Sequence, residues 1–381
     1  MSRVIGQRRP VLGVDFHVWD GIYQGSRSHI IGLYRAAIRQ APDIDFVFFL
    51  QDIGGLRQAH AEFAAPNVRL VPMSQRSGLW REAVQLPWLQ WRHRLDLLHM
   101  QYRLPWVRIG AAACTIHDLL PESHPQFFPR LFARLSCIAF RHAARRAQLL
   151  FTVSRFTRDE LVRLYGTAPE RIHLTCNGVD FARFTPGLTG VDLVRNLGLT
   201  PGHYLLTVGR LEPRKNHHTL VRAYARLGPE VPPLVIVGQR DFSHQAVFAE
   251  IDRLGLSDRV RLLARVDDAT LPAVMRHATL FVYPAFAEGF GMPVAEAMAS
   301  GVAVITSNTT SLPEVAGDGA VLVDPHDEEA LAAAMQGLLA DAPARARLVQ
   351  VGLLHVRQFD WQISASVLLA AVRAYLTREK A

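Results

Sequence analysis

The sequence predicts an α/β protein built from two doubly wound parallel-sheet domains in tandem. Its 381 residues exceed what one ordinary hydrophobic core accommodates, so two domains of roughly 150 to 200 residues are expected. Short apolar runs alternate with helix-like segments from one end of the chain to the other, which indicates repeated βαβ units. Strands buried on both faces of a parallel sheet have this continuous apolar character.

The predicted strands are apolar runs bounded by Gly, Asp or Pro. In the first half they are Val11–Asp15, Phe46–Leu50, Val68–Val71, Leu95–His99, Ala111–Ile116, Leu149–Val153 and His173–Cys176. In the second half they are Tyr204–Val208, Leu234–Val237, Val260–Leu263, Leu280–Tyr283, Val302–Thr306 and Ala320–Val323. Helical patterns between them include Ser28–Arg39, Asn216–Leu227, Ala246–Leu254 and Glu328–Leu339.

Proline and glycine accumulate in Phe181–Gly202, which is the expected linker between the domains. We therefore expect a first domain over residues 1–188 and a second over residues 189–360. The last segment, residues 361–381, is predicted to be a helix that crosses back to the first domain.

Composition narrows the possible function. The chain has 42 Lys and Arg against 34 Asp and Glu, a formal net charge of +8. This excess suggests a phosphate-bearing partner or an anionic membrane surface. No zinc-finger spacing, aromatic RNA-binding signature or basic tail favours nucleic acid. No apolar run reaches the ~20 residues that span a bilayer, and the N-terminus lacks a signal-peptide core, so a cytoplasmic protein is expected. The three cysteines, Cys114, Cys137 and Cys176, are expected to be reduced, buried thiols.

The most informative segment lies between Glu288 and Glu296. It contains Gly289-Phe290-Gly291-Met292-Pro293, followed by a short helical pattern that Gly301 ends. Pro293 suits the first position of a helix, and the glycines leave backbone N–H groups open toward an anion at the positive end of the helix dipole. If a phosphate binds between the two glutamates, each carboxylate needs a hydroxyl group of the ligand as its hydrogen-bond donor. A nucleotide-sugar has this order of groups: sugar, diphosphate, ribose. An isolated pair of glutamates would more often be a solvated loop charge and a helix-dipole partner.

A second cationic loop follows the strand Tyr204–Val208. Arg210 and Lys215 lie at the carboxyl end of this strand, next to a helix start expected to be capped by Asn216. Arginine can bind a diphosphate in bidentate fashion and lysine adds a point charge. The alternative is a solvated turn with ordinary surface charges.

Three segments of the first half carry weaker signals. His117 follows the strand Ala111–Ile116, where it can bind a sugar hydroxyl, steady positive charge through its carbonyl oxygen, or simply complete the strand. The loop that ends in Gly25 and Ser26 precedes a helix and is a candidate phosphate loop, although it lacks the dinucleotide-binding spacing. Asp43-Ile44-Asp45 matches a metal-binding pattern but precedes a strand, at the wrong end of the sheet, so no metal site is predicted.

A basic and aromatic region completes the first half. Arg130, Arg134, Arg141 and Arg145 fall on one face of a predicted helix, and Leu131, Leu135 and Ile138 on another. Upstream, four tryptophans (Trp80, Trp88, Trp91, Trp106) are interleaved with four arginines (Arg81, Arg92, Arg94, Arg103). This combination suits an acidic lipid surface, and an ordinary solvated helix is the alternative.

Taken together, these motifs resemble the retaining glycosyltransferases of the GT-B type, in family four of that classification (group 1 glycosyl transferases). The resemblance is strongest over Tyr204–Asp324. It rests on Val208–Asn216, Glu288–Ala297 and Ser311–Val315, and more sparsely on Thr115–Asp118, Thr152–Thr157 and Asn177–Asp180.

The resemblance implies two Rossmann-like domains that face each other across a cleft, the second holding a nucleotide-sugar. Arg210 and Lys215 would neutralise the leaving diphosphate, and the N–H groups near Phe290, Gly291 and Met292 would meet its phosphates. Glu288 would bind the donor sugar, Glu296 the ribose, and His117 would face the transferred sugar. Transfer would retain the anomeric configuration with no cofactor and no divalent metal. The family often has a second glycine two residues after the first in its N-terminal loop. Here Ser26 and Arg27 follow Gly25, so Arg27 is expected to contact an acceptor phosphate instead.

The predicted function is transfer of mannose from GDP-mannose to a lipid-linked or polysaccharide acceptor, at the inner face of the cell membrane. The mannose assignment follows from Thr115–Leu119 and Ser311–Val315, which resemble bacterial mannosyltransferases of surface-polysaccharide pathways. Glucose from UDP-glucose is the near alternative. A nucleotide-sugar epimerase would need further carboxylates and no acceptor surface, and a non-catalytic membrane adaptor would not need Glu288, Arg210 and Lys215 together.

Overall fold

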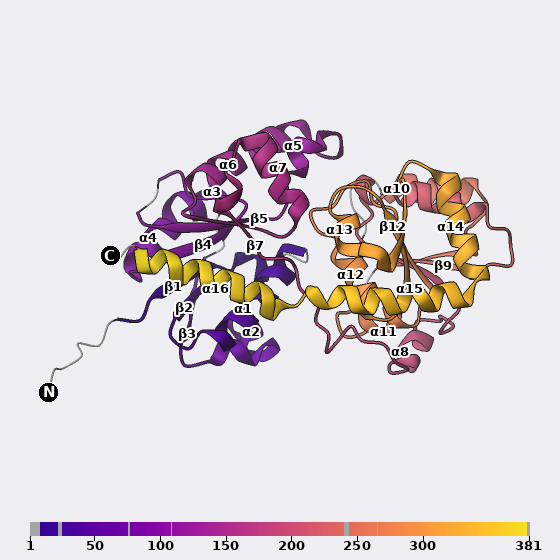
Figure 1. The fold of residues 1–381 in the computed structure, drawn as a ribbon, viewed down its shortest axis with the longest axis horizontal. Helices are drawn as coiled ribbons and strands as arrows, with labels where there is room; N and C mark the ends of the chain where they lie inside the picture. Colours follow the sequence, from indigo (N-terminus) through magenta and orange to yellow (C-terminus); the bar gives the residue numbers. More distant parts are fainter. Residues whose placement is uncertain are drawn as a thin grey trace. The chain divides into compact units, whose positions relative to one another are not determined.

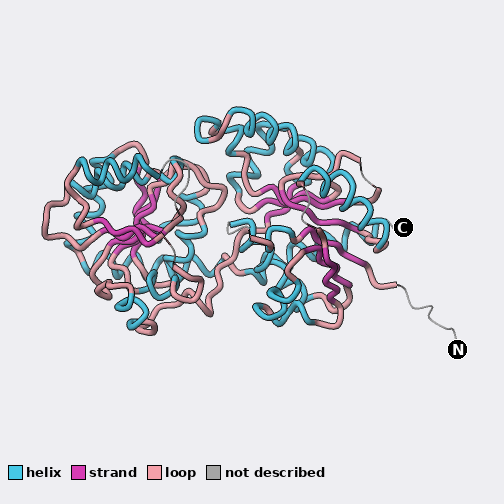
Figure 2. Tube along the Cα trace, turned by 180° about the vertical axis from the view of Figure 1, so that it is seen from behind, coloured by secondary structure: helices cyan, strands magenta, loops and turns pink. Residues whose placement is uncertain are grey.

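The chain forms two compact α/β units. The computed structural model describes residues 8–21, 25–74, 77–107, 109–239, 244–264 and 266–378. The first unit comprises Met1–Gly178 together with Asp360–Ala381, and the second comprises Val179–Phe359. In each unit a central parallel sheet is covered by helices on both faces (Figure 1, Figure 2).

The first unit has a seven-stranded sheet in the order β3-β2-β1-β4-β5-β6-β7. Every pair is parallel, and the register aligns Leu12 of β1 with Phe46 of β2 and Leu97 of β4. The strands are β1 Val11–Asp15, β2 Asp45–Leu50, β3 Val68–Pro72, β4 Leu97–Gln101, β5 Ala112–Ile116, β6 Leu149–Thr152 and β7 Ile172–Leu174.

The helices of this unit cover two hydrophobic cores, one on each face of the sheet. Leu12 and Val14 face one core, while Val11 faces the other, as strand alternation requires. The α-helices are α1 Gly25–Gln40, α2 Ile53–Ala59, α3 Gly78–Trp80, α4 Leu86–Arg92, α5 Leu120–Ser123, α6 Arg130–Arg146, α7 Arg155–Tyr165 and α16 Trp361–Arg378. Short helical segments are η1 His17–Trp19, η2 Ala61–Ala64, the π-helix η3 Arg81–Gln85, η4 Pro125–Phe127 and η5 Pro169–Arg171.

The last helix, α16, packs along α1 in the first unit (Figure 1). The ring of Trp361 occupies the space that a side chain at Gly32 would need, since a Cβ there would overlap the indole. Arg373 of α16 pairs with Asp43 at 2.7 Å. Close packing around the glycine and this ion pair fix α16 on the face that α1 provides.

The second unit has a six-stranded parallel sheet in the order β10-β9-β8-β11-β12-β13. Its strands are β8 Leu205–Val208, β9 Leu234–Val237, β10 Val260–Leu263, β11 Leu280–Tyr283, β12 Ala303–Ser307 and β13 Ala320–Val323. Its helices are α8 Val191–Asn196, α9 His217–Ala225, α10 His244–Arg253, α11 Leu271–Arg276, α12 Met292–Ala299, α13 Leu312–Ala316, α14 Glu328–Ala340 and α15 Ala342–His355, with turns η6 Pro213–Lys215, η7 Gly317–Gly319 and η8 Val356–Gln358.

All the predicted strands are present, with ends that shift by no more than two residues. The prediction that Phe181–Gly202 is a linker was wrong in part. This segment contains helix α8, and Phe184 is buried in the second unit. Residues 179–188, expected in the first domain, belong to the second unit. Among the cysteines, only Cys114 is fully buried, and all three are free thiols.

Among the residues that the structure describes, no helix combines the length and apolar character required to cross a bilayer.

Candidate active site

The candidate donor site of the second unit lies at the carboxyl ends of β8 and β11. The strand order reverses between these neighbours, and ligands of doubly wound sheets bind in the crevice beside such a reversal. Two loops follow these strands, residues 209–216 and residues 284–291. Gly238 lets neighbouring backbones approach, because a Cβ at that position would overlap the carbonyl oxygen of Gly209.

Glu288 is the centre of a buried cluster of charges formed by these loops. The residue is only 7% exposed. Its Oε1 pairs with Nζ of Lys215 and accepts a hydrogen bond from the hydroxyl of Tyr283 at 2.7 Å. Its Oε2 lies 3.0 Å from Nη1 of Arg214, whose Nη2 also contacts Glu212 at 2.7 Å. Glu288 is therefore not a solvated loop charge.

The cluster shifts the pKa values of its members. Burial alone would raise the pKa of Glu288, but Arg214 and Lys215 outweigh burial and lower it to about 2. Burial, with Arg214 nearby, lowers the pKa of Lys215 from its ordinary value. Burial and the carboxylate of Glu288 raise the pKa of Tyr283 well above its ordinary value. The tyrosine is thus a neutral hydroxyl that can donate to Glu288 and accept from Lys215, which lies 2.7 Å away.

Arg214 and Tyr283 are members that the sequence analysis missed. Arg214 lies within the cationic loop, but its sequence position gives it no role distinct from Arg210. Tyr283 is the last residue of β11, and a polar residue at the carboxyl end of a strand beside the reversal of strand order is the signal that could have identified it.

The loop from Glu288 to Gly291 is fixed by side chains of the next segment. The hydroxyl of Ser311 lies 2.9 Å from the carbonyl oxygens of both Glu288 and Phe290, and its one hydrogen can be donated to either. The N–H of Glu288 donates to Thr310 Oγ1 at 3.0 Å. Gly291 adopts a left-handed conformation with φ of 100°, which strains any residue with a side chain.

Helix α12 follows this loop directly. It begins at Met292, so Pro293 takes the second position and not the first as expected. The first N–H groups of a helix have no intrahelical partner, so those near Gly291 and Met292 are available to an anion. Phe290 is buried, with its ring 5.2 Å from that of Phe359 in an edge-on contact, and can therefore offer its backbone but not its side chain.

Glu296 lies on the second turn of α12 in surroundings unlike those of Glu288. Burial raises its pKa to about 8; Arg183 counteracts this shift, and Asp268 and Asp180 reinforce it. The two glutamates of the motif thus differ in charge at neutral pH, Glu288 being ionised and Glu296 largely protonated.

The side chain of Asn216 fixes the cationic loop through hydrogen bonds that the sequence analysis did not predict. Asn216 does not cap helix α9 with its side chain, as expected, because it adopts a left-handed backbone conformation with φ of 59°. Its Nδ2 donates instead to the carbonyl oxygens of Pro284 at 3.0 Å and Pro325 at 2.7 Å. Asn216 therefore ties the loop of Lys215 to the loop that leads to Glu288. Arg210 lies half-buried at the start of the same loop, two residues after β8.

In the first unit, His117 is buried just after β5. Burial lowers its pKa well below the ordinary value, and His29 and His99 add to this shift. Its Nε2 lies 2.7 Å from Oε1 of Gln101, at the end of β4, and its carbonyl oxygen accepts a hydrogen bond from Thr157 at 3.0 Å. His117 is thus a neutral ring held at the carboxyl edge of the sheet.

Gly25, Ser26 and Arg27 form the first turn of α1, not a loop ahead of it. The preceding residues 22–24, part of the candidate phosphate loop, lie outside the described residues. The guanidinium of Arg27 lies 4.4 Å from the ring centre of Trp19, in a cation–π contact.

The Asp43–Asp45 pattern has a structural explanation. Asp45 begins β2, at the amino end of the sheet, and lies 3.8 Å from Arg9. Asp43 is paired with Arg373 of α16. Within the described ranges of the chain, no group of three or more His, Cys, Asp or Glu residues is arranged to hold a metal ion.

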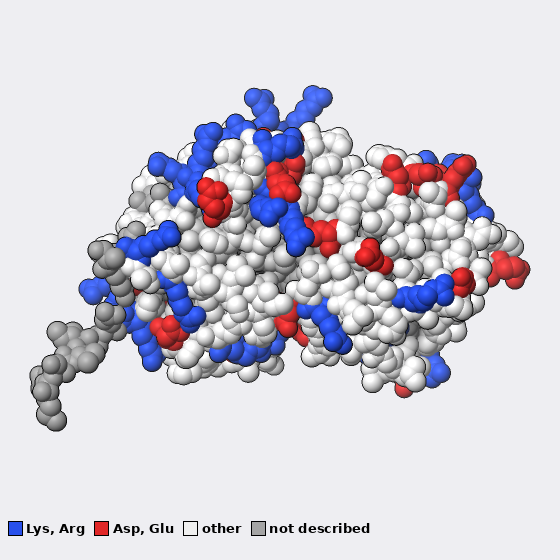
Figure 3. Space-filling view, viewed as in Figure 1, with Lys and Arg blue, Asp and Glu red and all other residues white. Residues whose placement is uncertain are grey.

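Helix α6 presents an unusual exposed face. Its inner residues, such as Ala133 and Phe140, are buried, while Leu131, Leu135 and Ile138 are each more than half exposed. Beside this apolar stripe runs the stripe of Arg130, Arg134, Arg141 and Arg145, because these positions recur at helical spacing. Figure 3 shows basic side chains gathered over this part of the first unit.

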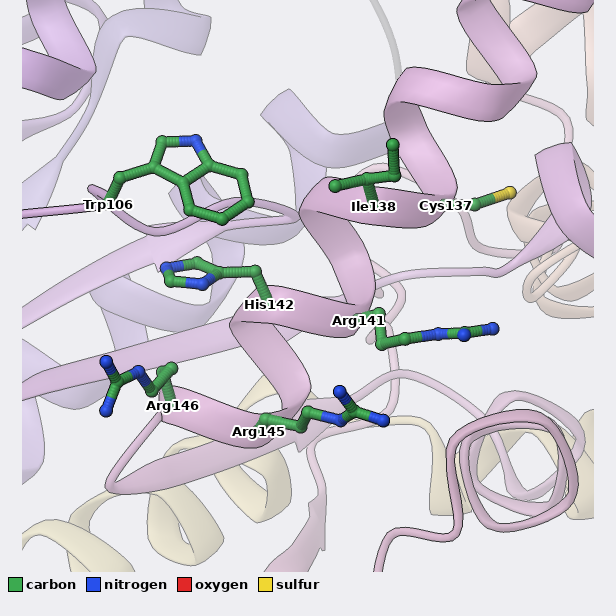
Figure 4. Close-up of a pocket in the computed structure, with 7 residues that line it drawn as sticks. All are labelled: Trp106, Cys137, Ile138, Arg141, His142, Arg145 and Arg146. Carbon is green, nitrogen blue, oxygen red and sulfur yellow. The ribbon is translucent and has the colours of Figure 1, made fainter.

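A cavity of about 470 Å³ lies on the C-terminal part of α6. Trp106 packs its ring 4.1 Å from that of His142, and Arg145 and Arg146 extend from the following turn (Figure 4). Arg141 of the same cavity is paired with Glu122 at 3.1 Å. The surface of α6 therefore combines apolar, aromatic and cationic groups in one place.

The comparisons with known proteins identify both units. The family model of glycosyltransferase family 4 matches residues 23–183, and that of the group 1 glycosyl transferases matches residues 196–353. The chain is 32% identical to the O-antigen chain mannosyltransferase B of Escherichia coli, over 82% of this chain and 85% of that protein. It is 33% identical to a D-inositol 3-phosphate glycosyltransferase of Thermobifida fusca, over 56% of this chain and 52% of that protein.

The fold is also that of known glycosyltransferases. The structure of sucrose-phosphate synthase from Thermosynechococcus elongatus superposes with a TM-score of 0.78 at 20% sequence identity, covering 97% of this chain and 100% of the other. This likeness supports two Rossmann-like domains of the GT-B fold. With both family models and the O-antigen relative in agreement, the chain belongs to the group 1 glycosyl transferases of glycosyltransferase family 4.

Proposed function

We propose that this glycosyltransferase moves mannose from GDP-mannose, with retention of configuration, to a lipid-linked or polysaccharide acceptor in cell-surface glycan synthesis. The observation that carries the proposal is the buried cluster of Lys215, Glu288, Arg214 and Tyr283 at the reversal of strand order. The O-antigen mannosyltransferase relative supports the choice of mannose and of a surface polysaccharide. Glucose from UDP-glucose remains the second candidate donor, because the sequence motifs do not distinguish the two bases.

In this proposal the donor diphosphate binds between the cationic loop and α12. Arg210 and Lys215 neutralise it, and the N–H groups of Phe290, Gly291 and Met292 donate to its oxygens. Since Phe290 is buried against Phe359, its role is confined to the backbone.

The ion pair of Lys215 and Glu288 gives the two residues a shared role. Before the donor binds, the carboxylate compensates the buried ammonium group, which would otherwise be costly. An arriving diphosphate competes for Lys215, while Arg214 and Tyr283 continue to hold Glu288. The carboxylate can then accept hydrogen bonds from the donor sugar and favour positive charge at its reacting carbon.

Two further residues are proposed to bind the two ends of the donor, the ribose and the transferred sugar. Glu296 binds the ribose hydroxyls from the second turn of α12. His117, a neutral ring in the first unit, binds the transferred sugar. Because Arg210 and Lys215 supply the positive charge, we propose that no divalent metal is required. In the first turn of α1, Gly25, Ser26 and Arg27 are proposed to bind an acceptor phosphate.

We further propose that α6 attaches the protein to the inner face of an anionic membrane. The exposed leucines and isoleucine can enter the headgroup region, while the neighbouring arginine stripe binds acidic lipids. A peripheral enzyme of this kind would meet a lipid-linked acceptor at the surface that holds it.

The test measures donor choice directly. Thermal unfolding is followed with GDP, UDP, ADP and no nucleotide, and product formation is then measured with GDP-mannose and UDP-glucose. Stabilisation by GDP, and sugar transfer from GDP-mannose, is the expected outcome. Stabilisation by UDP alone would replace the donor by UDP-glucose, and no response to any diphosphate would overturn the assignment of the site.

A further inference from the structure

The end of β1 in the first unit holds a pair of side chains that the proposed donor site does not use. The strand order of this sheet reverses between β1 and β4, so a ligand crevice is expected beside the carboxyl end of β1. Asp15 is the last residue of β1, and His17 begins the turn η1. Both residues therefore lie where a doubly wound unit offers its side chains to a ligand.

Asp15 holds the ring of His17 in a fixed orientation. Its Oδ1 accepts a hydrogen bond from the backbone N–H of His17 at 3.3 Å and lies 2.9 Å from the ring Nδ1. The side chain of Asp15 is 2% exposed, whereas that of His17 is 20% exposed. The carboxylate is thus buried, while the imidazole that it orients keeps access to the surface.

The charge of Asp15 determines which ring nitrogen carries a proton. Burial opposes ionisation, but His17 and Arg81 outweigh it and lower the pKa of Asp15 below its ordinary value. An ionised carboxylate can only accept hydrogen bonds, so Nδ1 of His17 carries the proton. In the neutral ring Nε2 then has a free lone pair, and no side chain or backbone group of the described residues is hydrogen-bonded to it.

The other charged groups around the pair restrain Asp15 further. Nε of Arg81, on the π-helix η3, lies 3.6 Å from Oδ2 of Asp15, and Arg81 also contacts Glu82 at 3.5 Å. Burial raises the pKa of Glu82, which interacts with Arg103 as well as with Arg81. Oδ1 of Asp15 is thus hydrogen-bonded to His17, while Oδ2 lies at ion-pair distance from Arg81.

His99 provides a comparison, because it is a histidine of the same sheet whose two ring nitrogens are both hydrogen-bonded within the protein. His99, on β4, is 1% exposed and uses both nitrogens, Nδ1 with Tyr34 at 2.6 Å and Nε2 with Thr115 at 2.8 Å. His17 differs in both respects, since its ring is partly exposed and one nitrogen is held while the other is open.

From this geometry we propose that His17 binds a hydroxyl group of the acceptor sugar through Nε2, with Asp15 as the residue that positions its ring. The inference rests on the proposed glycosyl transfer and assigns to His17 a hydrogen bond with the acceptor substrate. A hydroxyl suits this nitrogen because it can donate to a lone pair and still accept from another group. Fixing that hydroxyl before reaction reduces the entropic cost of bringing acceptor and donor together.

The test separates acceptor binding from donor chemistry. His17→Phe removes the nitrogen and keeps a ring, while His17→Gln restores a polar group that can accept a hydrogen bond. His173→Phe, on β7, is the matched control because it is a half-buried histidine of the same unit that is outside the proposed site. Transfer from GDP-mannose to octyl α-mannoside, hydrolysis of GDP-mannose without acceptor, and GDP binding by calorimetry are measured for each.

We expect His17→Phe to lower kcat/KM for octyl α-mannoside by roughly 10- to 100-fold, mainly through a higher acceptor KM, the scale of a lost hydrogen bond to an oriented group. Donor hydrolysis and GDP affinity should remain within about twofold of wild type, and His17→Gln should recover part of the loss. Equal loss of transfer and hydrolysis, or unchanged transfer in His17→Phe, would overturn the inference. If the wild-type protein did not bind GDP, the result would instead contradict the proposed transfer from GDP-mannose, on which the inference about His17 rests.

Discussion

Lys215 and Glu288 form a buried ion pair at the carboxyl edge of the second sheet, and the hydroxyl of Tyr283 is hydrogen-bonded to both. Removing one partner of a buried ion pair leaves an uncompensated charge that destabilises the folded protein. Each of the two residues therefore contributes to stability by neutralising the other. In the proposed donor complex, the diphosphate therefore replaces Glu288 as the anion beside Lys215. Substitutions here therefore have two readouts, turnover and stability, which need separate measurement.

Replacing Arg210 or Lys215 of the cationic loop should impair the reaction. We expect Lys215→Ala and Arg210→Ala each to lower turnover by at least ~100-fold, because each removes positive charge from the leaving diphosphate. Initial rates with saturating GDP-mannose test this. Arg195→Ala provides the control, since Arg195 is an exposed arginine of the same unit that pairs with the exposed Asp192. A folded variant of Lys215 or Arg210 with nearly normal turnover would contradict the assigned role.

Chelation should leave the activity intact. If Arg210 and Lys215 supply the positive charge as proposed, the rate should be the same with and without EDTA. The measurement compares dialysed enzyme in EDTA with the same enzyme after addition of magnesium or manganese. A reproducible loss in EDTA that either metal restores would show that a divalent ion takes part.

The membrane proposal predicts charge-dependent binding to vesicles. The wild-type protein should bind anionic vesicles more tightly than neutral ones, and less tightly as salt is added. Replacing Arg130, Arg134 and Arg145 by Gln should weaken binding on the order of 100-fold, because each arginine near the surface contributes about 1 kcal/mol. These three are chosen because Arg141 is paired with Glu122.

A control with the same change in net charge isolates the position of the arginines. Replacing Arg195, Arg347 and Arg357 by Gln alters three exposed arginines of the second unit. This variant should bind vesicles as the wild type does. Equal partitioning of the wild type to anionic and neutral vesicles would favour an ordinary solvated helix.

The sequence was sufficient for the regular part of the fold. Strands such as Leu280–Tyr283 are buried on both faces and therefore apolar throughout, which makes them visible in a single sequence. Segments whose conformation depends on distant partners were not predictable. Asn216 has the composition of a helix cap, yet its side chain binds the carbonyl oxygens of Pro284 and Pro325, which come from far along the chain.

Lys215 and Glu288 were predicted as members of the candidate site, whereas Arg214 and Tyr283 were not, and the pairing of these side chains could not be predicted. The motif analysis assigned Lys215 to a phosphate and Glu288 to a sugar as separate contacts, since nothing in a linear spacing shows that two side chains 73 residues apart meet. The opposite pKa shifts of Glu288 and Glu296 could not be predicted either. Burial acts to raise the pKa of both glutamates, but Arg214 and Lys215 outweigh it at Glu288, whereas Arg183 does not outweigh it at Glu296.

The raised pKa of Glu296 predicts a dependence of stability on pH. The folded protein binds this proton more tightly than the unfolded chain, whose ordinary value is 4.5. The stabilising contribution is therefore complete below about pH 4.5 and is lost as the pH rises through about 8. Urea unfolding of wild type and Glu296→Gln between about pH 5 and about pH 9 tests this. The free energy of unfolding of the wild type should fall relative to that of the variant, and a constant difference would contradict the burial of this carboxyl group.

The two glutamates should also fail differently when each is changed to Gln. Glu288 is ionised and held by Lys215, Arg214 and Tyr283, where the donor sugar is proposed to bind. Glu288→Gln keeps the shape but removes the negative charge that favours a cationic reacting carbon, so turnover should fall more than in Glu296→Gln. Because this change also leaves Lys215 without its anion, thermal unfolding of the variant must be measured beside its turnover.

Glu296 is proposed to bind ribose hydroxyls, whose hydrogen bonds change little during the reaction, so its loss should appear in donor affinity. Glu296→Gln should weaken GDP binding by roughly 1.5–3 kcal/mol when the wild-type carboxyl group is ionised, the scale of a charge-assisted hydrogen bond. Since its pKa is about 8, the difference between wild type and variant should be largest above that pH and should shrink below it. Calorimetry with GDP on both sides of this pH, together with turnover, decides the assignment. If Glu288→Gln lost GDP affinity while Glu296→Gln alone lost turnover, the two roles would be reversed, and the donor would lie the other way round along α12.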